Sequence, residues 1–353
     1  MNPPEMTSLQ RVLTALGHSE PDRVPFFLLV TMHGARELGL SIRDYFSRAE
    51  NVADGQLRMR EKYRHDCLYT FFYAPIEVEA WGAEVLFSED GPPNSGEPLI
   101  KNYSAIEKLV PPVVEDSRIL RKVLSATEQL KARTGGDVPI IGVVMSPFSL
   151  PVMQMGFDHY LNLIHEEPAI LEKLMRVNEE FCVSWANSQI RAGATAICYF
   201  DPVSSSTIIP RELYRQTGFP VAQRTMARIE APLAIHFASG RCLPILKDVA
   251  ATGPAVAGVS SEEDLGELKS AAGGKLSLLG NLNGIAMRHW SRSEAETAVK
   301  DAIAKAGPGG GFILSDNHGE IPWQVPEEVL SAISEAVHRW GRYPLRWTEN
   351  NEQ

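Results

Sequence analysis

The chain has 353 residues, of which 44% are hydrophobic and 22% charged, and its formal net charge is −10. An acidic chain of this balance indicates no nucleic-acid partner, and because no apolar run reaches the roughly 20 residues of a spanning helix we expect no membrane partner. The opening MNPPEMTSLQRVLTALG lacks the basic and apolar regions of a secretory signal. These exclusions predict a cytoplasmic protein.

The chain repeats a pattern in which a short apolar run is followed by a polar break and then by an amphipathic stretch. The runs are rich in β-branched and aromatic residues without alternation, which is typical of strands covered by helices on both faces. They span residues 24–30, 67–73, 139–145, 196–200, 233–237, 255–259, 275–280 and 311–315. Eight such runs alternating with helices predict an α/β fold, a (β/α)₈ TIM barrel.

An open, doubly wound sheet is the alternative architecture. It would carry a Gly-rich phosphate turn after an early strand, and the sequence contains no G-x-G-x-x-G. The Gly-rich stretch 307–311 precedes a strand and therefore predicts a tight turn. We expect one barrel domain over 1–353, with an N-terminal helical extension over 1–22. The segment 74–100 is too long for a simple connection and predicts a hairpin or lid.

Polar side chains follow most of the predicted strands at the point where each strand ends. Asp201 and His236 end the fourth and fifth runs, and we expect them to be catalytic, because barrel enzymes assemble their active sites at the carboxyl ends of the strands. The expected substrate-binding residues are His33, Ser146, Asn281 and Arg241. Six polar strand ends that converge at one mouth indicate a functional site.

Each of these residues also has a structural explanation. A histidine near a strand end is often a hydrogen-bonded core residue. Asp201 precedes a proline and could cap the following helix. Arg241 could pair with an acidic neighbour, and His318 could serve only to shape the turn 315–318.

The residue types support two kinds of chemistry. Imidazoles joined by carboxylates or thiolates from different strand ends would form an open zinc site, with one position left for substrate. A metal-free acid–base site would use much the same residues. Because the sequence has no H-E-x-x-H or C-x-x-C element, its residues alone leave both kinds of site open.

The order of several motifs resembles that of the uroporphyrinogen decarboxylase superfamily. The opening RVLTALGHSEPDRVPFF is followed by VEAWGAEVLFSEDGPP, SPFSLPVMQMGFDHYLNLIHEEP, AGATAICYFDPVSSSTIIP, IHFASGRCLPILKDVAATG, LLGNLNG and GGGFILSDNHGEIPWQVPEEVLSAISEAV. The resemblance spans nearly the whole chain. It implies a distorted (β/α)₈ barrel, in agreement with the eight apolar runs.

Within that superfamily the chain resembles most closely the corrinoid-dependent (methylcobamide) methyltransferase branch. The Arg-rich loop of true uroporphyrinogen decarboxylases is absent after the first run, where only Arg36 stands. The branch holds zinc through an H-x-C-G element after strand five and a G-C-G element after strand eight. His236 matches the first histidine, whereas Ala238 and His318 stand where the two cysteines are expected. The resemblance therefore implies Zn²⁺ held by His236 and His318, with Glu79 or Cys242 completing the set.

The same resemblance implies a partner, a separate corrinoid protein whose cobalamin exchanges a methyl group with a small methylated molecule. Since both thiolates are replaced, we expect the site to favour an oxygen ligand over a thiol. A methoxy compound is accordingly the expected substrate, and the enzyme would act as a demethylase.

Three other functions stay open. A metal-free lyase or decarboxylase would use Asp201 and His236 as acid and base, and Arg36 or Arg241 to bind a carboxylate. A methylcobamide:thiol methyltransferase of the coenzyme M type would use the same barrel. A corrinoid- or tetrapyrrole-binding module without catalysis would also explain the missing cysteines.

Overall fold

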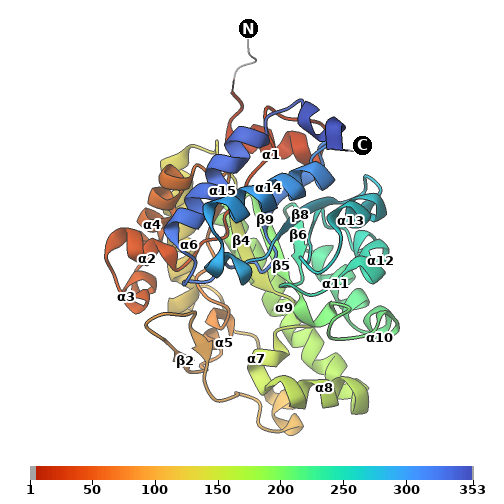
Figure 1. Ribbon diagram of the computed structural model, residues 1–353. Coiled ribbons are helices and arrows are strands. Elements are labelled where there is room, and N and C mark those ends of the chain that lie inside the picture. Colours follow the sequence, from red (N-terminus) through yellow and green to blue (C-terminus); the bar gives the residue numbers. More distant parts are fainter. Residues whose placement is uncertain (1–4, 352–353) are drawn as a thin grey trace.

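The computed structural model describes residues 5–351 and is dominated by one parallel sheet that curls toward a barrel (Figure 1). The strands follow one another around the sheet in chain order. They are β1 (Leu68–Tyr69), β4 (Ile140–Met145), β5 (Ala196–Phe200), β6 (Leu233–His236), β7 (Val256–Gly258), β8 (Ser277–Leu282) and β9 (Phe312–Asp316). Nearly all their residues are buried, as expected where helices cover one face and the barrel interior the other. Seven of the eight predicted runs thus contain a strand.

The first run, 24–30, is not a regular strand, which corrects the prediction for that segment. It nevertheless lies between β9 and β1: Leu314 N–H donates to Pro25 O at 2.9 Å, and Asp66 N–H donates to Phe26 O at 2.7 Å. Phe26 and Leu314 form a single parallel bridge. Because proline has no N–H to contribute to a ladder, pairing stays sparse at Pro25. The segment closes the ring irregularly, and the fold is a distorted TIM barrel.

Helices connect successive strands and cover the outside of the barrel. The α-helices are α1 (Ser8–Leu16), α2 (His33–Leu38), α3 (Ile42–Ser47), α4 (Ala49–Tyr63), α5 (Ile76–Ala80), α6 (Arg118–Thr134), α7 (Pro151–Met155), α8 (Phe157–Glu166), α9 (Pro168–Arg191), α10 (Arg211–Gln216), α11 (Gly218–Met226), α12 (Leu246–Ala250), α13 (Leu265–Ala272), α14 (Arg292–Ala306) and α15 (Glu327–Trp340). Short 3₁₀ helices are η1 (Tyr103–Lys108), η2 (Pro202–Ser204), η3 (Leu243–Ile245), η4 (Ala286–His289) and η5 (Arg346–Asn351). Within residues 5–351, no helix combines the length and apolarity needed to cross a membrane.

Helix α1 occupies the N-terminal segment for which an extension was predicted; residues 1–4 of that segment lie outside the described part of the chain. Thr7 and Gln10 form a capping box at its start, which satisfies two free backbone N–H groups. Figure 1 places α1 at the opposite end of the sheet from α7 and α10, the helices that follow β4 and β5. The α7 and α10 end is therefore the carboxyl end of the strands, where the site was expected.

The segment 74–100 holds the short helix α5 and a small antiparallel ladder. In this ladder β2 (Val85–Leu86) pairs with β3 (Asn94–Ser95). The two strands belong to a sheet separate from the barrel.

Candidate functional site

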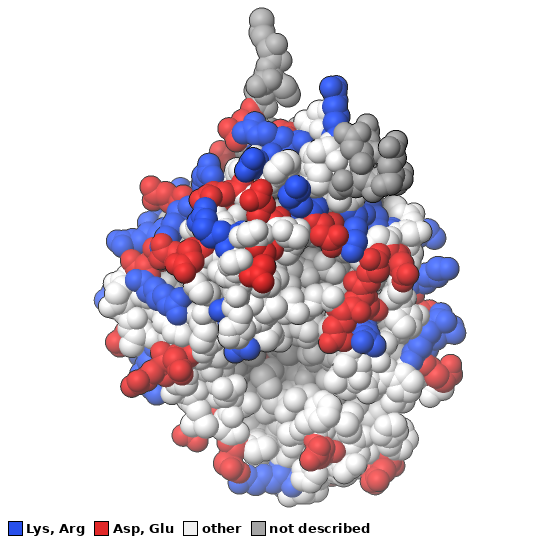
Figure 2. Space-filling model, viewed as in Figure 1, with Lys and Arg blue, Asp and Glu red and all other residues white. Residues whose placement is uncertain are grey.

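The loops at the carboxyl ends of the strands meet over the mouth of the barrel. The turn after β6 reaches across to the loop after β9, where Ser239 N–H donates to Asn317 O at 2.9 Å, although two strands separate β6 from β9. In the view of Figure 2 the molecule is hollowed near its centre, toward the end of the sheet from which α7 and α10 leave. Few Lys, Arg, Asp or Glu side chains are visible around this hollow.

Asp201 lies at the end of β5 in a buried hydrogen-bond network. Its Oδ1 accepts from the hydroxyls of Ser146 at 2.6 Å and Ser149 at 2.7 Å. Burial raises the pKa of Asp201, and the serine hydroxyls oppose that rise only in part. The structure thus brings two expected site residues, Asp201 and Ser146, together. Both are fully buried, so their visible role is to join the ends of β4 and β5.

His236, the last residue of β6, is a buried and tightly packed imidazole. Its ring stacks on Phe200, with centroids 4.8 Å apart and planes 15° apart. Nδ1 accepts from the backbone N–H of Ala238 at 3.0 Å, while the buried Nε2 has no hydrogen-bond partner among residues 5–351. Burial, followed by the proximity of His318, lowers the pKa of His236 to about 3. The ring is therefore neutral at physiological pH.

A strained turn follows His236. Ala238 and Ser239 have φ angles of 46° and 71°, a left-handed conformation that costs a non-glycine residue about 1 kcal/mol or more. The Ser239 hydroxyl contacts Nδ1 of His318, which comes from the loop after β9. One turn thus contacts both histidines that the sequence singled out.

The four expected zinc ligands do not converge. Glu79, on α5, accepts a hydrogen bond from the Tyr73 hydroxyl at 2.7 Å. Burial and the nearby Glu263 raise the pKa of the Cys242 thiol well above its ordinary value, so it is not a ready thiolate. Throughout residues 5–351 there is no group of three or more His, Cys, Asp or Glu side chains placed to hold a metal ion. Nδ1 of His236 already accepts a hydrogen bond from a backbone N–H. The four side chains expected to ligate zinc therefore do not form a zinc site.

Of the three remaining expected substrate-binding residues, Asn281 and Arg241 are committed to neighbours. Asn281 donates to Ser260 O at 2.9 Å. Arg241 pairs with Glu262 at 3.1 Å on the surface. His33 is buried beside Trp323, with ring centroids 5.8 Å apart, and burial together with the nearby Arg36 lowers its pKa to about 3.

Several residues of the mouth were not singled out individually by the sequence. Phe200 forms the stacking surface for His236, and Asp316 Oδ2 accepts from the N–H groups of His318 and Gly319 at 2.8 Å, which shapes the turn after β9. Glu320 accepts from the Thr31 hydroxyl. The D-N-H-G pattern was a usable signal for an Asp-capped turn, but no local pattern marks Phe200 as a stacking partner.

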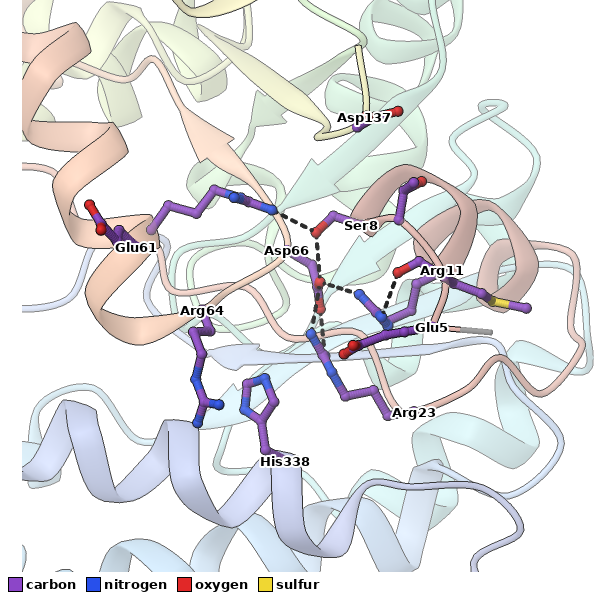
Figure 3. Close-up of a pocket in the computed structure, with 12 residues that line it drawn as sticks. Glu5, Ser8, Arg11, Arg23, Glu61, Arg64, Asp66, Asp137 and His338 are labelled. Atoms are coloured by element: carbon purple, nitrogen blue, oxygen red, sulfur yellow. Dashed lines mark hydrogen bonds and ion pairs between the residues drawn. The ribbon is translucent and has the colours of Figure 1, made fainter. Parts of the chain in front are cut away.

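A second cavity, of about 420 Å³, lies at the opposite end of the barrel. Figure 3 shows Arg11 and Arg23 converging there on Asp66, which precedes β1. Asp66 also accepts from Ser8 and from the N–H of Phe26. Because catalytic residues of barrels gather at the other end, we interpret this network as one that ties α1 and the 24–30 segment to β1.

The fold and mouth define an α/β-barrel protein with its candidate site at the carboxyl ends of the strands, and sequence comparison gives the family. The uroporphyrinogen decarboxylase (URO-D) family profile matches residues 7–340, so the chain belongs to that family. It is similar to the uroporphyrinogen decarboxylase of Thioalkalivibrio sulfidiphilus, with 26% identity over 94% of this chain and 97% of that protein. The uroporphyrinogen decarboxylase of Aromatoleum aromaticum is 28% identical over 80% of each chain.

Among solved structures, a methyltransferase from Methanosarcina mazei superposes with a TM-score of 0.85 at 22% identity, over 95% of this chain and 99% of that one. A B12-independent methionine synthase from Shewanella sp. W3-18-1 gives a TM-score of 0.55 at 12% identity, over 92% of this chain and 98% of that one. At these identities the two structures show a shared fold.

Proposed function

We propose that this chain is a methyltransferase of the URO-D family that moves a methyl group between a small methylated compound, such as a methoxy compound, and a separate corrinoid protein. The observation that carries the proposal is that both arginines expected to bind a carboxylate are engaged elsewhere. A porphyrinogen with several carboxylates needs several cations to bind it, and this mouth offers neither arginine freely.

Arg36 is held by the loop after β9. Its guanidinium donates to the carbonyl of Trp323 and to that of Val325 at 3.4 Å, and lies 3.8 Å from the centroid of the Trp323 ring. Arg241 forms an exposed pair with Glu262. The few charges around the hollow in Figure 2 agree with this arrangement and favour a neutral substrate over a polycarboxylate.

The chain's own residues would bind and orient the methylated compound. His236 and His318, joined by the turn at Ser239, provide hydrogen-bonding groups, and Phe200 covers one face of the His236 ring. Cobalamin on the corrinoid partner would supply the cobalt that exchanges the methyl group. Zinc has no step in this scheme, since the residues present do not fit it.

A metal-free lyase or decarboxylase is the second candidate. The names of the curated relatives favour it, and so does a mouth in which the expected metal ligands are not assembled. It would need Arg36 or Arg241 to leave its present partners to bind a carboxylate.

The deciding experiment incubates the purified chain with reduced cobalamin, cob(I)alamin, and a panel of methoxylated aromatic compounds and methanol. We expect methylcobalamin to accumulate, followed by its absorption spectrum, at a rate at least tenfold lower for Ser239→Ala. A parallel assay supplies methylcobalamin and coenzyme M to detect transfer to a thiol. Release of carbon dioxide from uroporphyrinogen, with no methyl transfer in either assay, would establish the decarboxylase instead. Tight cobalamin binding without turnover would indicate a binding module.

A further inference from the structure

The Phe237–Gly240 turn determines which nitrogen of His236 carries hydrogen. Two consecutive non-glycine residues, Ala238 and Ser239, hold positive φ angles in this turn. Such strain persists only where surrounding structure enforces it, and it clusters at functional sites. Here the strained backbone folds back so that the Ala238 N–H meets His236 Nδ1 at 3.0 Å.

A backbone N–H can only donate a hydrogen bond. Nδ1 of His236 must therefore be the unprotonated acceptor nitrogen, and in a neutral imidazole the hydrogen then resides on Nε2. A metal ligated through Nε2 requires that nitrogen to be free of hydrogen, with the other nitrogen usually donating its N–H to a carbonyl or carboxylate. At His236 the two nitrogens have the opposite roles, because Nδ1 accepts an N–H and Nε2 carries the hydrogen.

The packing prevents the ring from turning over easily. Phe200 covers one face of the imidazole, and two glycines make room for its edge. A Cβ at Gly258 would overlap Cδ2 of His236, and a Cβ at Gly319 would overlap Phe200 and come within 3.2 Å of Cε1. Rotating the ring would also leave the Ala238 N–H facing carbon. The ring orientation is thus set by β5, β7, the loop after β9 and the Phe237–Gly240 turn.

We infer that the Phe237–Gly240 turn fixes His236 as a neutral imidazole with hydrogen on Nε2, so that this residue is a hydrogen-bond donor in the mouth and not a zinc ligand. Its buried Nε2–H has no acceptor among the described residues, and we assign that acceptor to an oxygen of the bound small molecule or to an enclosed water. The inference extends the proposed function by giving one residue a definite role. It is tested without turnover, so it can fail or hold independently of that function.

The first test reads the tautomer directly in the full-length chain labelled with ¹⁵N-histidine. Long-range ¹H–¹⁵N spectra, assigned by loss of signals in His236→Gln, should show hydrogen on Nε2 and none on Nδ1. His236→Gln also retains an N–H donor near the Nε2 position, and it should preserve folding better than His236→Ala. Hydrogen on Nδ1 of the wild-type residue would overturn the inference.

The second test measures zinc. Equilibrium dialysis of wild type, His236→Ala and the buried-histidine control His65→Ala should give the same zinc content for all three, with wild-type His236 signals unmoved by one equivalent of zinc. Stoichiometric zinc in wild type and His65→Ala that is lost in His236→Ala would overturn the inference. If His236→Ala fails to fold, the wild-type spectra decide. A shift of the His236 Nε2 signal on addition of zinc would then overturn the inference.

Discussion

Phe200 and His236 lie face to face at the mouth, with ring centroids 4.8 Å apart and an interplanar angle of 15°. Phe71 also stacks on Phe200, with centroids 6.1 Å apart and planes 5° apart. The imidazole thus belongs to a short aromatic stack built from the ends of β1, β5 and β6. The absence of a side chain at Gly319 lets the loop after β9 close over the stack.

Gly319→Ala should therefore disturb the stack. Its Cβ would overlap Phe200, and its φ of 86° is also unfavourable for alanine. The matched control is Gly82→Ala, which has a similar φ of 92°, and among the described residues only its chain neighbours lie within 4 Å of the added Cβ. We expect the backbone to cost about 1–2 kcal/mol in both variants and overpacking to cost about 1–3 kcal/mol more in Gly319→Ala alone. Urea unfolding measures the difference, and equal losses would refute this role of Gly319.

Asp66→Asn should be strongly destabilising. The Asp66 carboxylate is fully buried and pairs with Arg11 at 2.7 Å and Arg23 at 2.6 Å. Removing its charge leaves the buried Arg23 without a carboxylate partner among the described residues and leaves Arg11 with Asp22 alone, at a cost of about 3–5 kcal/mol. Asp54→Asn removes an exposed Asp54–Arg133 pair at 2.5 Å and should cost less than about 1 kcal/mol. Similar losses in the free energy of unfolding would contradict the structural role assigned to the cavity in Figure 3.

The same aspartate should contribute to acid unfolding. Burial alone would raise the pKa of Asp66, but Arg23 and Arg11 outweigh burial and lower it. Its contribution is therefore present above the unfolded pKa of about 3.9 and is lost as pH falls toward the lower folded value. The stability gap between wild type and Asp66→Asn should be constant from pH 8 to 5 and narrow below pH 4. If the stability difference between wild type and Asp66→Asn instead widened as pH fell, the pKa of Asp66 would be raised in the folded state and not lowered.

Glu77 should give the opposite pH dependence. It is buried beside β4, where Oε1 accepts from the Met145 N–H at 2.8 Å, and burial raises its pKa from 4.5 to about 8. The folded state then holds an extra proton between these values, so the free energy of unfolding falls as pH rises through this window, by at most about 1.4 kcal/mol per unit. Glu77→Gln removes this slope, and its stability relative to wild type should increase from pH 5 to pH 8. A difference in the free energy of unfolding between Glu77→Gln and wild type that does not change with pH would mean that Glu77 is ionised in the folded state.

Arg241→Gln should leave the proposed reaction nearly unchanged. Its pair with Glu262 is exposed at both ends, so stability should change by less than about 1 kcal/mol, and KM for a methoxylated substrate should stay within a factor of two. Arg36→Gln should cost more, because Arg36 holds the 323–325 loop and stacks on Trp323, a contact worth about 0.5–2 kcal/mol. A large rise in KM for Arg241→Gln would support the carboxylate-binding alternative.

Local patterns sufficed for most of the barrel. Seven of the apolar runs contain strands. Because both faces of a parallel sheet are covered, its strands are apolar throughout, and such runs can be recognised in the sequence without knowing which strands lie next to them. The run 24–30 has the same composition but only bridges β9 and β1. Its irregularity depends on the lack of an N–H at Pro25 and on where the ring closes, and the latter is a property of the whole barrel.

The sequence by itself determined the barrel type and which polar residues end the strands, because periodicity and chain order are local properties. It also placed His236 and His318 where two loops meet, through the resemblance to a family. Only the tertiary structure decided which partners the polar side chains of the site have. Arg36 and Arg241 are paired with neighbours, and Asp201 accepts hydrogen bonds from serines. The Ala238 N–H donates to Nδ1 of His236. Partners and tautomers depend on contacts between residues that are distant in sequence, or on a strained turn, and no pattern of residue types encodes them.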